Sequence, residues 1–153
     1  MNTESELNEK YFIRNLEKED YNKGYFNLLG QLTKAPEPSF EDWAKRFDLI
    51  NKQEMTKIIV IESKEDNKVV GTISLMFEYK FIRNLGMIGH IEDFVVDEKC
   101  RGLKFGKILI EKAIEEAKNR GCYKILLDAN DSVAGFYEKI GFSKNSNGMS
   151  IYF

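Results

Sequence analysis

A predicted buried strand passes into an amphipathic helix through a run of glycines and cations, Arg101-Gly102-Leu103-Lys104-Phe105-Gly106-Lys107. Such a junction exposes unpaired backbone N–H groups at the positive end of the helix dipole, and glycine lets an anion approach the backbone. The run therefore predicts a pyrophosphate site. A Walker loop is excluded because Ile108 stands where Ser or Thr would hold magnesium, and the glycine spacing excludes a dinucleotide fingerprint. Taken alone, the run is also typical of a strand-to-helix turn that binds nothing.

Two carboxylates, Glu92 and Asp93, interrupt the otherwise apolar segment IEDFVV. Charged side chains inside such a strand are costly unless they face a polar site, so we favour a site over a charged pair at a strand edge. Lys80, Arg83 and Lys124 are a supply of cations for a phosphate, although such residues most often form only a solvated surface.

Composition excludes several other functions. Among 153 residues, 23 basic and 25 acidic side chains leave a net charge of -2, which gives no overall attraction to nucleic acid or to an anionic membrane. Cys100 and Cys122 match no metal-ligand spacing, and His90 is the single histidine, so we expect neither a metal nor a disulfide. Residues 1–10 are polar, and no apolar run approaches the ~20 residues that span a bilayer. We therefore expect a flexible N-terminal tail and a cytoplasmic protein.

Apolar periodicity indicates one α/β domain over residues 11–153. It predicts strands at 11–16, 57–63, 69–79, 91–96, 123–128 and 150–153, with a hairpin turn at EDNK. It predicts helices over 17–32, from a Ser39 cap to Ile50, over 105–120, and from a Ser132 cap to Gly141. The expected fold is a mixed, mainly antiparallel sheet of six or seven strands with helices on both faces.

Longer motifs resemble a known family. The glycine run, GHIEDFVVD (89–97), GCYKILLD (121–128) and FYEKIGF (136–142) resemble the GNAT superfamily of acetyl-CoA-dependent transferases. FIRNLEKED (12–20), Leu32-Thr33 and KFIRN (80–84) narrow the resemblance to its glucosamine-6-phosphate N-acetyltransferase family, and nearly every predicted element is covered. The chain departs from the family loop at Lys104, which replaces the middle glycine.

The resemblance implies a GNAT fold that binds acetyl-CoA, with no metal. The residues that it assigns to CoA lie on the strand, the loop and the last helix: Phe94, Val95, Val96, Arg101, Gly102, Leu103, Lys104, Phe105, Gly106, Lys107, Tyr137, Glu138 and Lys139.

The resemblance also implies catalytic roles. In the family, a bulge in the fourth strand frees a backbone N–H toward the thioester carbonyl, and Glu92, Asp93 and Phe94 correspond to it. Asp128 receives or orients the proton of the amine, the alternative being a turn-capping Asp. Tyr137 donates its phenolic proton to the CoA thiolate, the alternative being a core Tyr.

For the acceptor, the resemblance implies glucosamine 6-phosphate, attacked directly in a ternary complex, and a place in UDP-N-acetylglucosamine synthesis. The residues implied to bind it are Thr33, Lys80, Phe81, Ile82, Arg83, Glu92, Asp93, Asp128 and, from the second subunit of a homodimer, Tyr123 and Lys124. Tyr152 stands near the C-terminus, where relatives often carry a basic residue.

Two alternatives stay open. A GNAT enzyme for another small amine or a protein amine would not need Lys80, Arg83 and Lys124. A catalytically silent CoA-binding module would not need Asp128 and Tyr137.

Overall fold

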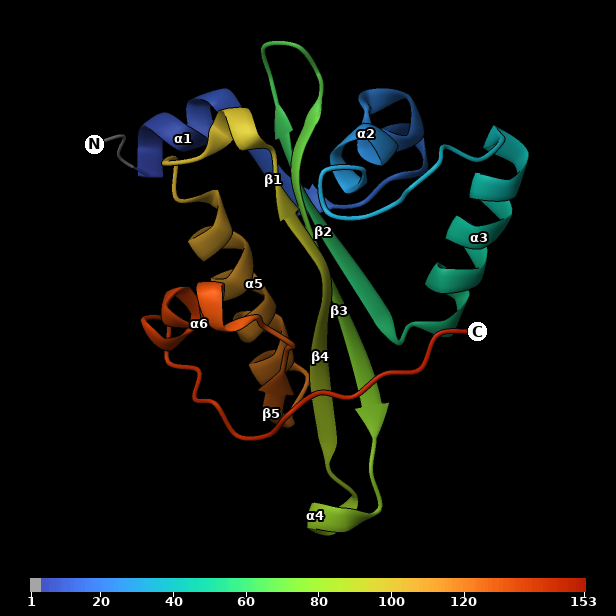
Figure 1. Cartoon of the computed structure of the whole chain (residues 1–153). Coiled ribbons are helices and arrows are strands. Elements are labelled where there is room, and N and C mark those ends of the chain that lie inside the picture. Colours follow the sequence, from blue (N-terminus) through green and yellow to red (C-terminus); the bar gives the residue numbers. More distant parts are fainter. Residues whose placement is uncertain (1–3) are drawn as a thin grey trace.

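The computed structural model describes the backbone of residues 4–153 and the side chains from residue 7 onward. The elements follow in the order α1 Glu4–Lys10, β1 Tyr11–Asn15, η1 Lys18–Lys23, α2 Tyr25–Leu29, α3 Phe40–Gln53, β2 Thr56–Ser63, β3 Val69–Tyr79, α4 Ile82–Leu85, β4 Met87–Val96, η2 Glu98–Cys100, α5 Phe105–Asn119, β5 Cys122–Leu126 and α6 Asp131–Glu138. Figure 1 shows these helices arranged around a central sheet.

Five strands form a single mixed sheet in the order β1-β2-β3-β4-β5. The first three pairings are antiparallel, and β4 pairs with β5 in parallel. The predicted β2–β3 hairpin is confirmed, and β3 has the predicted bounds, Val69–Tyr79. A mixed, mainly antiparallel sheet with flanking helices is therefore confirmed, whereas the predicted number of six or seven strands is wrong.

The strand predicted at residues 150–153 is not formed. Ile151, Tyr152 and Phe153 have no regular structure, and each is at least 80% exposed. Apolar side chains alone do not make a strand, because its backbone N–H and C=O groups need a neighbouring strand as partner.

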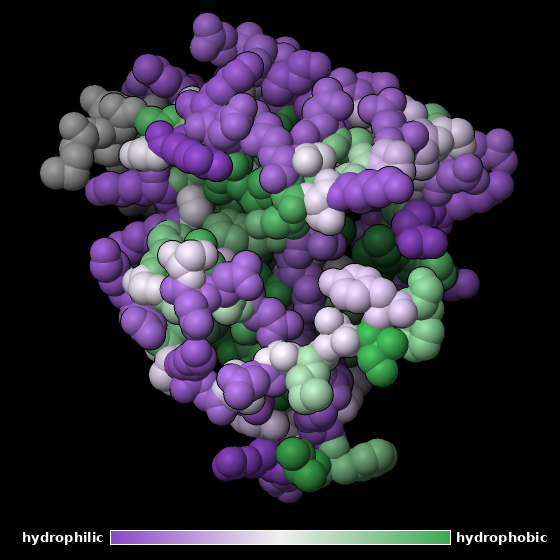
Figure 2. All heavy atoms as spheres, viewed as in Figure 1, coloured by the Kyte–Doolittle hydropathy of each residue, from purple (hydrophilic) through white to green (hydrophobic). Residues whose placement is uncertain are grey.

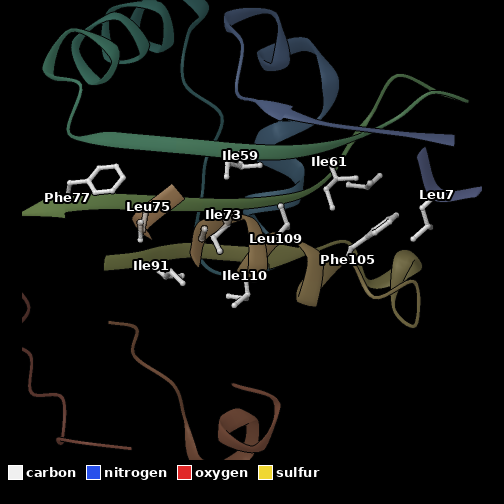
Figure 3. Packing of buried hydrophobic residues seen from close by; sticks show 13 residues of the cluster. Leu7, Ile59, Ile61, Ile73, Leu75, Phe77, Ile91, Phe105, Leu109 and Ile110 are labelled. Atoms are coloured by element: carbon white, nitrogen blue, oxygen red, sulfur yellow. The ribbon is translucent and has the colours of Figure 1, made fainter. Parts of the chain in front are cut away.

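Alternating side chains place apolar residues on both faces of the sheet. One face carries Ile59, Ile73 and Leu75 in a cluster with Leu109 and Ala113 of α5, as Figure 3 shows for the labelled residues. The other face carries Val60 and Val69 in a cluster with Tyr25, Leu28 and Trp43 from α2 and α3. The two-residue period of the strands thus produces helices on both faces.

The N-terminal third differs from prediction in two places. The helix predicted over residues 17–32 is divided into η1 and α2 by Gly24, whose φ of 76° is left-handed and terminates the first helix. The tail predicted over residues 1–10 contains the helix α1 from Glu4, and its Leu7 is buried; Met1 to Thr3 lie outside the described residues. A single buried leucine in a short polar segment leaves no periodic pattern to detect.

The other predicted caps are close to the observed ones. Ser39 caps α3, accepting a hydrogen bond of 3.2 Å from the backbone N–H of Asp42. The last helix begins at Asp131 with Asn130 as its N-cap residue, two positions before the predicted Ser132.

A buried ion-pair network joins β1, η1 and β2. Arg14 donates to both carboxylate oxygens of the fully buried Asp20, at 2.7 and 2.8 Å, and to Glu62 at 3.0 Å. Lys23 completes the network with Glu62 at 2.8 Å. Two positive and two negative charges balance, so the network is neutral when all four groups are ionised.

Within residues 4–153, no helix is both long enough and apolar enough to cross a membrane. The same range contains no group of three or more His, Cys, Asp or Glu side chains arranged to hold a metal ion.

Candidate active site

The strand β4 contains a β-bulge at Asp93 and Phe94. Ser74 of β3 faces Glu92, and Thr72, two residues earlier, faces Val95, so β4 has one residue more than its partner. Asp93 has a φ of 45°, in the left-handed region. A bulge leaves its extra residue outside the ladder and bends the strand. The bulge expected from the family resemblance is therefore present in β4.

The sheet opens next to this bulge. The parallel pairing of β4 with β5 ends at His90 and Leu126, although β4 continues to Val96. Asp128 follows the end of β5, and the 101–104 loop follows the end of β4. The carboxyl ends of parallel neighbouring strands lie at the same edge of a sheet, where ligands of α/β proteins bind. The bulge, the loop and Asp128 therefore belong to one end of the sheet.

The loop 101–104 and the start of α5 have the properties of an anion site. Gly102 and Lys104 have φ values of 87° and 63°, and Lys104 is the N-cap of α5 without a side-chain cap hydrogen bond. The first turn of α5 has no acidic residue, whereas Arg101, Lys104 and Lys107 surround it with positive charge. Uncapped N–H groups, the helix dipole and these cations all favour a bound phosphate.

Aromatic rings line the space between β4, α5 and α6. Phe94 of the bulge stacks with Phe136, with ring centroids 6.5 Å apart, and Tyr137 lies edge-on to both. A Cβ atom at Gly106 would lie 3.3 and 3.4 Å from these two phenylalanine rings, so glycine allows α5 to approach them closely. Tyr137 is half-buried here, and burial raises the pKa of its phenol.

The predicted carboxylates are exposed, and they reach different surroundings. Asp93 lines a cavity of about 930 Å³ between the sheet and α2 and α3, together with Ser74, Tyr25 and Trp43. Asp128 is exposed beside the C-terminal segment, where a Cβ atom at Gly148 would lie 3.5 Å from its Oδ1 atom.

The residues predicted to bind the sugar phosphate lie mainly at the tip of the β3–β4 hairpin. Lys80 forms an ion pair with Glu78, which also contacts His90 Nε2 at 2.9 Å. Arg83 and Lys124 lie over the ring of Tyr123, at 5.8 and 5.9 Å from its centroid.

Thr33 is exposed in the segment before α3. The cavity beside Asp93 is lined by none of Thr33, Lys80, Arg83, Tyr123 and Lys124. Within one chain, Arg83 and Lys124 thus lie at Tyr123 and Lys80 lies at Glu78, and none of them lines the cavity.

Burial limits two side chains at the ends of the loop: Phe105, which is predicted to bind CoA, and Cys100. Phe105 is only 2% exposed, so its ring belongs to the core and only its backbone is available to a ligand. Burial, and then Asp97 and Asp66, raise the pKa of Cys100, which makes its thiol a poor nucleophile.

Tyr25 lines the cavity beside Asp93, a position that the sequence does not indicate. It is buried, and it lines the cavity next to Asp93; burial raises the pKa of its phenol to about 12. Its spacing from Leu28 and Leu29 predicts only a core position, and no residue-level signal marks a polar role.

The bulged and opened sheet and the basic, uncapped N-terminus of α5 are the features expected of an acyltransferase that binds CoA. The chain belongs to the acetyltransferase (GNAT) family, whose sequence model matches residues 11–142. It is 43% identical to the glucosamine 6-phosphate N-acetyltransferase of Arabidopsis thaliana, across 95% of this chain and 98% of that protein. A crystal structure of the Arabidopsis enzyme superimposes with a TM-score of 0.91, covering 94% of this chain and 98% of that one.

A second named enzyme and a second solved structure are also similar to this chain. The glucosamine 6-phosphate N-acetyltransferase 1 of Dictyostelium discoideum is 41% identical, across 92% of this chain and 89% of that protein. An acetyltransferase structure from Trypanosoma brucei has a TM-score of 0.88 at 36% identity, covering 94% of this chain and 99% of that one.

Proposed function

We propose that this chain transfers the acetyl group of acetyl-CoA to the amine of glucosamine 6-phosphate, through one acetyltransferase domain over residues 11–153. The observation that carries the proposal is the 43% identity, over nearly the whole length of both chains, to a relative with that name. The product would feed UDP-N-acetylglucosamine synthesis in the cytoplasm.

The donor site of this proposal is the basic N-terminus of α5 and the opening beside β4. The loop 101–104 and the first turn of α5, through Lys107, would hold the pyrophosphate with backbone N–H groups and cations. Phe94, Val95 and Val96 on one side and Tyr137, Glu138 and Lys139 on the other would contact the rest of CoA. Acetyl-CoA supplies the activated acetyl group, and no metal is needed for this reaction.

The chemistry of the proposal is a direct attack of the amine on the thioester. Asp128 would accept or orient the amine proton, while the backbone at the bulge would stabilise negative charge on the carbonyl oxygen. The C–N bond would form first and place negative charge on the carbonyl oxygen. The C–S bond would then break as the carbonyl is restored, and Tyr137 would give its phenolic proton to the departing thiolate. Glu92 and Asp93 would orient the sugar. Burial raises the pKa of Tyr137 above its ordinary value of 10.0, so its phenol carries the proton at neutral pH, as it would without the shift.

The proposed enzyme is a homodimer with shared active sites. Phe81, Ile82 and Leu85 at the hairpin tip are 93%, 65% and 73% exposed, and Figure 2 shows apolar side chains at the tip over α4. Such an apolar tip favours contact with another surface. A second chain would let Tyr123 and Lys124 reach the substrate site of the first, to which we also assign Thr33, Asp93 and Asp128.

Hybrid dimers of two inactive variants test the shared site. If Tyr123 of one subunit completes the site that holds Asp128 of the other, mixing Asp128→Asn with Tyr123→Ala gives each hybrid dimer one site with both residues intact. Activity then returns. If both residues serve one chain's own site, every site keeps one substitution and mixing restores nothing. Light scattering on the unmixed protein gives the oligomeric state.

Thiol release from acetyl-CoA tests the substrate. Glucosamine 6-phosphate is compared with glucosamine, spermidine and a peptide amine, and we expect strong preference for the phosphorylated sugar. Arg83→Gln should raise the KM for glucosamine 6-phosphate and leave turnover of glucosamine unchanged. Preference for another amine would reject this acceptor but keep the chemistry, and CoA binding without any turnover would favour a silent binding module.

A further inference from the structure

Helix α1 contributes one side chain, Leu7, to the core at the start of α5, although α1 precedes the segment that the family model matches, residues 11–142. Leu7 of α1 is 7% exposed and belongs to the same buried cluster as Phe105, Ile61 and Val70. Figure 3 shows Leu7 and Phe105 next to each other at one end of this cluster, and Phe77 and Leu75 at the other. Leu7 therefore lies at the end of the core that is next to Phe105, the first residue after the loop 101–104.

Phe105 connects this core to the loop. It is the first residue of α5 and follows Lys104 directly. Its ring is 2% exposed, and the ring of Tyr11 meets it edge-on with centroids 4.7 Å apart. Leu103 also packs against the cluster. Since α5 has no side-chain cap hydrogen bond, apolar contacts from α1 and β1 hold this end of the loop.

The upstream end of the loop has a separate, polar anchor. The backbone N–H of Asp97 donates to Val70 at 2.8 Å, and the side chain of Gln31 contacts both Asp97 and the backbone N–H of Glu98. The left-handed residues Gly102 and Lys104 lie between the two anchors. Because this geometry is intrinsically unfavourable for Lys104, it depends on both ends being fixed.

The helix α1 is itself tied to the rest of the chain. Lys64 donates from Nζ to the carbonyl of Asn8 at 2.6 Å and from its backbone N–H to the carbonyl of Lys10 at 2.9 Å. These contacts hold the C-terminal end of α1 on the β2–β3 turn, so that Leu7 is presented to Phe105.

We propose that Leu7 is a positioning residue for the donor site: acting through Phe105, it holds the loop 101–104 and the first turn of α5 in the geometry that binds the CoA pyrophosphate. The inference rests on the proposed function, since it assigns this loop to CoA. A binding site that is ordered before the ligand arrives loses less entropy on binding, so loosening it weakens affinity without altering the reacting groups.

The experiment compares two matched substitutions in the full chain. Leu7→Ala and Leu75→Ala remove the same atoms from opposite ends of one cluster, so both create a cavity in the same core (Figure 3). Leu7→Val makes a smaller cavity, and it replaces Leu7→Ala in the comparison if Leu7→Ala does not fold. For each protein, the Kd of CoA is measured by calorimetry, and kcat and KM are measured with acetyl-CoA and with acetylpantetheine, which lacks the pyrophosphate.

We expect Leu7→Ala to raise the Kd of CoA and the KM of acetyl-CoA about threefold to tenfold, with Leu7→Val between it and the wild type. The kcat at saturating acetyl-CoA and the kinetics with acetylpantetheine should not change, and Leu75→Ala should leave the Kd of CoA within about twofold. An unchanged Kd in Leu7→Ala, an equal rise in Leu75→Ala, or an equal effect on acetylpantetheine would overturn the inference alone. Failure of the wild-type chain to bind CoA would overturn the proposed function and this inference together.

Discussion

Replacing Tyr137 with Phe removes the proposed proton donor and keeps the ring. The ring of Tyr137 lies edge-on to Phe94, Phe136 and Phe142, with centroids 6.4, 5.1 and 6.0 Å away. Tyr137→Phe preserves these aromatic contacts, so the free energy of unfolding should change by no more than about 1 kcal/mol. Loss of activity would then report chemistry rather than folding.

The expected reduction of kcat in Tyr137→Phe depends on how basic the leaving group is. General acid catalysis contributes about 10²- to 10⁴-fold, and a thiolate needs less help than a more basic leaving group. We therefore expect the lower end: Tyr137→Phe should reduce kcat about 100-fold, which is about 2.7 kcal/mol of transition-state stabilisation. The KM for acetyl-CoA should change little.

The pH dependence gives an independent reading of the same substitution. Burial raises the pKa of Tyr137 above its ordinary value of 10.0, so its acid form persists from neutral to moderately alkaline pH. The wild-type kcat should fall as the pH rises through this raised pKa, and Tyr137→Phe should lack that alkaline decline. Steady-state thiol release across the pH range measures both profiles.

Tyr21→Phe is the matched control, because the Tyr21 hydroxyl donates to the Pro38 carbonyl at 2.7 Å, within the other core cluster. It should leave the kcat and the alkaline decline intact. If Tyr137→Phe keeps kcat within about twofold of the wild type, the thiolate leaves without this donor and the assignment is refuted.

Three further substitutions test other parts of the structure. Asp128→Asn should lower kcat about 100-fold or more with folding preserved, as measured by steady-state kinetics; a wild-type kcat would make Asp128 a turn residue. Asp20→Ala removes one of the two buried carboxylates that balance the charges of Arg14 and Lys23. It should lower the free energy of unfolding, measured by urea denaturation, by about 3–5 kcal/mol; a loss below about 1 kcal/mol would contradict the network. Burial by itself would raise the pKa of Glu62, but hydrogen bonds from Lys23 and Arg14 leave it lowered from 4.5. Its contribution to stability is therefore present above pH 4.5 and lost as the pH falls through the lowered value, which acid titration of unfolding should show. Lys104→Gly should relieve the backbone strain of the left-handed φ of 63° and raise the free energy of unfolding by about 1 kcal/mol. A raised KM for acetyl-CoA in this variant would show that the charge of Lys104 helps to bind the cofactor. A less stable variant would show that the backbone of Lys104 is not strained.

Sequence patterns predicted the elements that show a long apolar run or a long helical repeat. Strand β3 has the predicted bounds because it is an apolar run whose first seven residues are all buried, and α5 begins at the predicted Phe105 because its buried positions follow a period of 3.6 residues. Local capping chemistry was equally readable at Ser39. The bulge at Asp93 was expected from family resemblance, since two carboxylates in a strand indicate a polar site but not an inserted residue.

The missed features depend on contacts between distant parts of the chain. Leu7 forms part of the core together with residues distant in the sequence, among them Phe105, nearly a hundred positions later. The apolar residues 150–153 form no strand because a strand requires a neighbour, which composition does not supply. Tyr25 resembles any core aromatic until the fold brings Asp93 to the same cavity.

The mixed pairing of the sheet also sets an order of assembly. The β2–β3 and β3–β4 hairpins close through the short segments 64–68 and 80–86, whereas β5 joins β4 in parallel only after α5 has crossed over the sheet. Short loops cost less entropy to close, so these hairpins form faster. During synthesis the N-terminal part of the chain also leaves the ribosome first. The sheet edge with its bulge can therefore form while Asp128 and Tyr137 are still to be synthesised. A nascent chain therefore acquires its two proposed proton-transfer groups after this sheet edge, and acetyl transfer has to wait until residues 128 and 137 have been synthesised and folded.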